Sequence, residues 1–96
     1  MSVIENPFDA SEYPLDLGGG IRVAKGADAL WILFPEPVGP IRVPLTGSPA
    51  WRVITESPLT LDPSIKVWKA REPNPPSVHG FVRDGRWVSC GDGQYH

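Results

Sequence analysis

The chain has 96 residues, which is enough for one small domain with a single hydrophobic core. Its net charge of −2 argues against duplex DNA as a partner, because the phosphate backbone demands clustered cations. The single cysteine excludes an internal disulfide framework, and the sequence contains no apolar run of about 18 residues that could span a membrane.

Proline and glycine punctuate the whole chain. With 12 Pro and 10 Gly, no long helix fits between the breaks. Residues 1–19 are polar, proline-broken and acidic, without a basic residue, and we expect an irregular acidic arm there. Residues 20–91 are expected to form a single β domain, and residues 92–96 a tail.

Short apolar runs between these breaks predict about seven strands, at residues 21–25, 29–34, 41–43, 50–55, 64–70, 77–83 and 86–90. The continuously apolar run 29–34 is typical of a central buried strand. The run 41–43 is flanked by prolines, which predicts an edge strand. Strands spaced by roughly ten residues predict an all-β fold, a small antiparallel barrel or sandwich.

The last two strands carry the strongest local signal. Asp84-Gly85 between two apolar-aromatic runs predicts a β-hairpin with a two-residue turn. Such a turn fixes the facing pairs, which are Arg83 with Arg86, Val82 with Trp87, Phe81 with Val88, Gly80 with Ser89, and His79 with Cys90.

One face of this hairpin holds reactive side chains. His79 faces Cys90, and Asp92 and His96 follow, so these four residues are a candidate zinc site. Alternatively, His79 deprotonates Cys90 as a nucleophile pair, or the two residues make a structural contact only. We favour the structural contact, because the ligands lack the spacing of a zinc motif. We therefore expect no cofactor, with zinc as the alternative.

Cations and aromatic residues interleave on the predicted strands. Arg83 opposite Arg86 is unfavourable, so the pair either extends into water at the hairpin tip or binds a partner. The tryptophans fill the core or form a stacking platform for single-stranded nucleic acid, and we favour the core. The residues expected to contact a partner are Lys66, Trp68, Lys69, Arg83 and Arg86.

One phrase of the sequence resembles a known family. Trp51, then Leu59-Thr60-Leu61-Asp62-Pro63-Ser64-Ile65, then His79 and Phe81-Val82-Arg83-Asp84-Gly85-Arg86 follow in order. They resemble small proteins encoded by bacteriophages and prophages that share a Pro-Thr-Leu-x-Pro-Ser-Ile and His-x-Phe-Val-Arg-Asp-Gly-Arg signature. Family members often carry a cysteine where this chain has Val78. The resemblance implies a phage-encoded accessory protein.

From these observations we expect a non-enzymatic protein that binds another protein. The most favoured role is a virion-associated or assembly accessory protein, located in the host cytoplasm or the virion. One alternative is an inhibitor of a host defence or host-machinery protein, similar to an anti-CRISPR protein, and a second is a small zinc-binding protein. The start of the chain lacks a secretory signal, so secretion is not expected. A homo-oligomer formed through an open strand edge is compatible with the sequence.

Overall fold

The computed structural model describes residues 3–36, 38–48, 50–62, 64–68 and 77–89. Within these residues the only helical segment is the short 3-10 helix η1 (Ala10–Glu12), so the all-β prediction is confirmed. The strands are β1 (Leu15–Gly18), β2 (Ile21–Lys25), β3 (Ala29–Leu33), β4 (Pro40–Pro44), β5 (Arg52–Glu56), β6 (Leu59–Asp62), β7 (Ile65–Trp68), β8 (Ser77–Arg83) and β9 (Arg86–Ser89). No described helix is long and apolar enough to cross a membrane.

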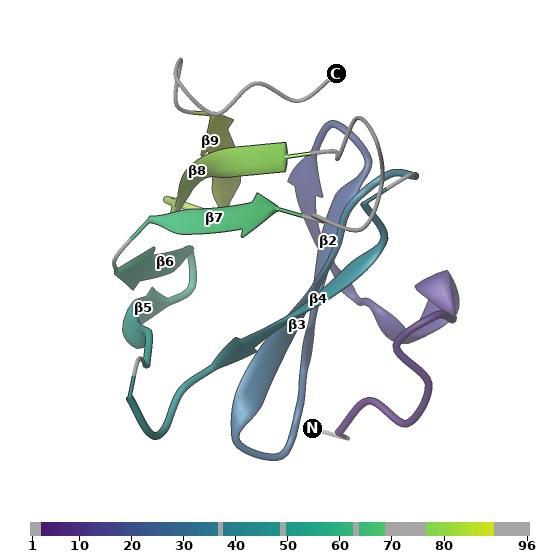
Figure 1. Cartoon of the computed structure of the whole chain (residues 1–96), viewed down its shortest axis with the longest axis horizontal. Coiled ribbons are helices and arrows are strands. Elements are labelled where there is room, and N and C mark those ends of the chain that lie inside the picture. The colour runs from purple at the N-terminus through teal and green to yellow at the C-terminus, as the bar shows by residue number, and fades with distance from the viewer. Residues whose placement is uncertain (1–2, 37, 49, 63, 69–76, 90–96) are drawn as a thin grey trace.

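The nine strands form three antiparallel sheets, shown in Figure 1. Sheet A has the order β1-β2-β3-β4, sheet B is the pair β5-β6, and sheet C has the order β7-β8-β9. None of these sheets closes into a barrel among the described strands, so the barrel prediction is wrong. The strand at 29–33 lies inside sheet A and β4 lies at its edge, as predicted.

Strand β1 was missing from the predicted set, whereas residues 58–63 were expected as an extended segment, and β6 lies there with Leu59 and Leu61 buried. Residues 15–18 were expected to belong to an irregular arm, but they pair with β2 as the edge of sheet A. The reversal between them uses three glycines with positive φ at positions 18–20. Leu17 is only 3% exposed and belongs to the core. Burial of the Leu17 side chain therefore stabilises the pairing of β1 with β2.

One hydrophobic core joins the three sheets. Sheet A contributes the largest share of the buried residues, including Ile32, and sheet B contributes Leu59 and Leu61. Sheet C contributes Ile65, Val78 and Val82, which are 2%, 3% and 0% exposed.

The hairpin of β8 and β9 has the predicted register. Arg83 pairs with Arg86, and the pairing continues inward to Gly80 and Ser89. Asp84 and Gly85 have φ of 52° and 74°, as a two-residue turn of this type requires. Backbone N–H groups of both turn residues donate to β6, Asp84 to the Thr60 hydroxyl at 2.9 Å and Gly85 to the Leu59 carbonyl at 2.8 Å. Sheets B and C are therefore joined at the hairpin tip.

Tyr13 predicts a loss of stability at alkaline pH. Its hydroxyl donates to the Pro7 carbonyl at 2.7 Å, and burial, followed by the charge of Glu12, raises the pKa of Tyr13 to about 12 from 10.0. A raised pKa means that folding favours the neutral phenol, so its stabilisation is complete below pH 10 and disappears between about pH 10 and 12. We expect the free energy of unfolding, measured with denaturant at several pH values, to fall across that window. In Tyr13→Phe this decrease should be smaller, and an unchanged profile would contradict the assignment.

Candidate functional site

Sheet C presents two different faces because side chains alternate along each strand. Ile65, Val78 and Val82 point into the core, and the alternate residues of each strand point outward. The outward set on β8 is His79, Phe81 and Arg83, and the first two of these are half-buried. The outward face of sheet C therefore holds the chemically active side chains.

Ser64 and His79 meet on this outward face. Ser64 directly precedes β7, and Ile65 pairs with Gly80, so His79 lies diagonally across from Ser64. The Ser64 Oγ atom lies 3.1 Å from Nε2 of His79, and both residues are half-buried. The pair is close enough for proton transfer and is not sealed from solvent.

The backbone of Ser64 is held by a neighbouring tryptophan. The Trp51 indole N–H donates to the Ser64 carbonyl at 3.2 Å. The backbone N–H of Trp51 donates to the Pro44 carbonyl at 2.9 Å, and its ring packs against the core. Through Trp51, the position of Ser64 is tied to the end of β4.

This arrangement suits nucleophilic catalysis. A serine hydroxyl is a weak nucleophile until a base removes its proton, and an imidazole nitrogen within about 2.6–3.2 Å can act as that base. With the His79 proton on Nδ1, Nε2 is the acceptor for the Ser64 hydroxyl. The described residues therefore bring a serine hydroxyl and an imidazole nitrogen into hydrogen-bond contact.

The predicted zinc ligands are only partly within the described structure. His79 lies on the expected face of β8, whereas Cys90, Asp92 and His96 lie outside the described residues. Within the described residues, no group of three or more His, Cys, Asp or Glu side chains could hold a metal ion. One hydrogen-bond contact of the His79 ring is with the hydroxyl of Ser64, the residue that precedes β7.

The structure describes three of the five predicted partner-binding side chains. Lys66 pairs with His79 across β7 and β8, and Arg83 and Arg86 lie opposite each other at the hairpin tip. The guanidinium of Arg83 lies 4.6 Å from the centre of the Phe81 ring, which is a cation–π contact. Lys69 lies outside the described residues, as does the side chain of Trp68.

Trp51 and Trp87 are half-buried and pack against the core. The Trp87 ring meets Phe34 edge to face, with centroids 5.1 Å apart and an interplanar angle of 82°. This packing is the one expected for core tryptophans at positions 51 and 87.

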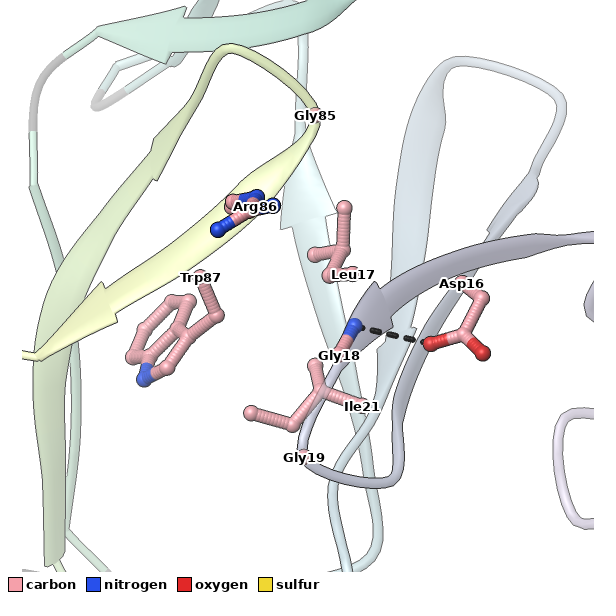
Figure 2. A pocket seen from close by; sticks show the side chains of 8 residues that line it. All are labelled: Asp16, Leu17, Gly18, Gly19, Ile21, Gly85, Arg86 and Trp87. Atoms are coloured by element: carbon pink, nitrogen blue, oxygen red, sulfur yellow. Dashed lines mark hydrogen bonds between the residues drawn. The ribbon is translucent and has the colours of Figure 1, made fainter.

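A surface pocket lies between the start of β9 and the glycine turn that connects β1 to β2 (Figure 2). Its volume is about 570 Å³. The Trp87 indole lies on one side and the side chains of Leu17 and Ile21 on the other. Asp16 accepts the Gly18 N–H at 2.7 Å and so fixes the glycine turn. Neither Ser64 nor His79 lines this pocket, so it is separate from the reactive pair.

A family model described as "Bacterial ubiquitination-like system serine protease (BubE)" matches residues 23–90, which is more than two thirds of the chain. The matched region contains both Ser64 and His79. Neither curated proteins nor solved structures gave a match.

This match corrects the expected function. A family of bacterial serine proteases contradicts a non-enzymatic phage protein, whether it acts in virion assembly or as an inhibitor of host proteins. The expectation that the chain is not an enzyme is wrong for the same reason. The nucleophile expected for His79 in the catalytic alternative was Cys90, across the hairpin. This expectation missed Ser64, which reaches the same imidazole from the neighbouring strand, although the phrase Pro63-Ser64-Ile65 had already been singled out.

Proposed function

We propose that this chain, which belongs to the BubE family, is a serine protease of a bacterial ubiquitination-like system, with Ser64 as nucleophile and His79 as general base. The observation that carries the proposal is the 3.1 Å contact between Ser64 Oγ and His79 Nε2. The family description supports peptide-bond hydrolysis as the reaction. The half-buried setting of both residues on an outward face gives a polypeptide substrate access to them.

The reaction divides into two transfers. The Ser64 Oγ bonds to the scissile carbonyl carbon while its proton passes to His79 Nε2. The carbon–nitrogen bond then breaks, and His79 returns the proton to the leaving amine, which leaves an ester on Ser64. Water, deprotonated by the same imidazole, hydrolyses this ester and restores the serine.

A fluorophosphonate probe tests the assignment without a known substrate. The Ser64 oxygen should bond to phosphorus as fluoride leaves, and the adduct should map to the peptide containing Ser64 by mass spectrometry. Ser64→Ala should not be labelled, and His79→Ala should be labelled about 10²–10⁴-fold more slowly, because the base is lost. Labelling at another serine, or equal labelling of Ser64→Ala, would overturn the proposal.

Trp51 should position the nucleophile. Trp51→Phe keeps an aromatic ring against the core but removes the N–H that donates to the Ser64 carbonyl. We expect the rate of fluorophosphonate labelling to fall several-fold, in line with loss of roughly 1 kcal/mol from one hydrogen bond. Trp87→Phe offers a matched control, because Trp87 is also a core tryptophan but makes its ring contact with Phe34. Equal losses in the two variants would show that the effect is general destabilisation.

A further inference from the structure

The basic residues of this protein fall into two groups that differ in their partners. Within the described residues, every basic side chain of sheets A and B belongs to an ion pair, namely Arg22 with Asp16, Lys25 with Glu56, Arg42 with Asp28, and Arg52 with Asp62. The basic side chains of sheet C are Lys66, Arg83 and Arg86, and none of the ion pairs found among the described residues includes them. All three are exposed.

These three cations lie on the strands that carry Ser64 and His79 or pair with them. Lys66 lies directly opposite His79 in the β7–β8 ladder, so its side chain projects from the same face. Phe81 follows His79 along that face, and the Arg83 guanidinium lies 4.6 Å from its ring centre. Arg86 is the cross-strand partner of Arg83. A chain bound across Ser64 and His79, and continuing along β8, therefore meets Lys66 first and the two arginines at the hairpin tip.

The placement of these charges is costly for the isolated protein. Two arginines directly opposite each other in a hairpin repel, which lowers stability. The whole chain has a net charge of −2, so this positive surface is a local feature of sheet C. A bound anion would remove the repulsion and supply charge complementarity, which guides association and register.

We propose that the substrate segment cleaved at Ser64 carries carboxylates next to the scissile bond, and that Lys66, Arg83 and Arg86 bind them. This inference rests on the proposed function, because it assigns a substrate class to the same site. Phe81, half-buried beneath Arg83, adds an apolar contact beside the bound carboxylate. The carboxylate is either an acidic side chain or a free C-terminus, and the two sources share this chemistry.

Binding is tested separately from cleavage by using Ser64→Ala protein. The probes are three fluorescein-labelled Gly/Ser peptides: one with four glutamates and an amidated C-terminus, one with four glutamines in their place, and one with the glutamines and a free C-terminus. Fluorescence anisotropy should show tighter binding of the glutamate peptide than of its glutamine counterpart. Stronger binding of the third peptide than of the second would identify a C-terminal carboxylate as the ligand. Added salt should weaken each charge-dependent difference, because exposed charges are screened.

Single substitutions then assign the effect to residues. Lys66→Gln, Arg83→Gln and Arg86→Gln should each weaken binding of the anionic peptide about two- to fivefold, as expected for exposed charge pairs. Arg42→Gln makes the same charge change on sheet A, where the arginine is paired with Asp28, and should leave binding unchanged. Equal binding of all three peptides, or equal losses in Arg42→Gln, would overturn the inference and leave the proposed nucleophile untouched. Failure of the probe to label Ser64, with peptide binding as expected, would overturn the proposed function and leave an anion-binding surface with no cleavage assigned to it.

Discussion

Replacing Ser64 with alanine should abolish hydrolysis of p-nitrophenyl acetate, an activated ester that requires a nucleophile but little recognition. We expect kcat/KM to fall by on the order of 10³–10⁶, the range seen when a serine nucleophile or its base is removed. His79→Ala should fall by a similar factor, because the two residues act as one unit and their losses do not add. The double variant should therefore be no worse than either single one, and the measurement is the release of p-nitrophenol.

The control for this prediction is Ser89, an exposed serine at the end of β9. Ser89 pairs with Gly80 and lies on the opposite face from His79, so Ser89→Ala should keep full activity. The free energy of unfolding of Ser64→Ala should remain within about 1 kcal/mol of the parent, because a half-buried hydroxyl contributes little to stability. Activity retained in Ser64→Ala, or lost equally in Ser89→Ala, would show that this pair is not the catalytic one.

The hairpin was predictable because its signal is local. Asp84 and Gly85 are among the few residues that adopt positive φ readily, and the structure has both in that region. Once the turn is known, the alternation of side chains fixes the facing pairs from Arg83 back to Gly80. The turn residues and the alternation of side chains therefore predict the pairing of β8 with β9, but not the pairing of either strand with the rest of the sheet.

The reactive pair was not predictable in the same way. Ser64 and His79 are 15 positions apart and meet only because β7 pairs with β8 in one register. The connection between these strands spans residues 69–76, and no turn type of that length determines a register. The available signal was the position of Ser64 directly before a strand, in the same phrase as His79, but a one-residue slip would have moved Ser64 to the other face.

The edge strand β1 escaped prediction for a related reason. Its four residues, Leu-Asp-Leu-Gly, are followed by two more glycines, a composition that indicates a loop. Its pairing with β2 contains a register irregularity between Asp16 and Gly18. Residues 15–18 form a strand because Leu17 is buried in a core formed by distant strands. Local strand propensity does not include the free energy of that burial.

Gly80 directly follows His79 on β8 and faces inward, so a change in its packing can move His79. A Cβ atom at this position would lie 2.5 Å from the Val88 carbonyl oxygen and 2.6 Å from Cζ2 of Trp87. The absence of a side chain lets the Trp87 indole pack across β8 and reach Phe34. Any substitution of Gly80 must therefore move either the backbone of β9 or this indole.

We expect Gly80→Ala to lower the free energy of unfolding by about 1–3 kcal/mol, the usual cost of forcing extra atoms into a packed region. Activity should fall further than the unfolded fraction explains, because a shift of β8 changes the distance between His79 and Ser64. Chemical denaturation gives the stability, and fluorophosphonate labelling of the folded protein gives the reactivity of Ser64. Gly47→Ala is the comparison: Gly47 has φ of 95° but no atom within 4 Å of its Cβ position, so its cost is backbone strain alone. Labelling should stay near the parental rate in Gly47→Ala and drop in Gly80→Ala, because only the second substitution displaces the strand that carries the base.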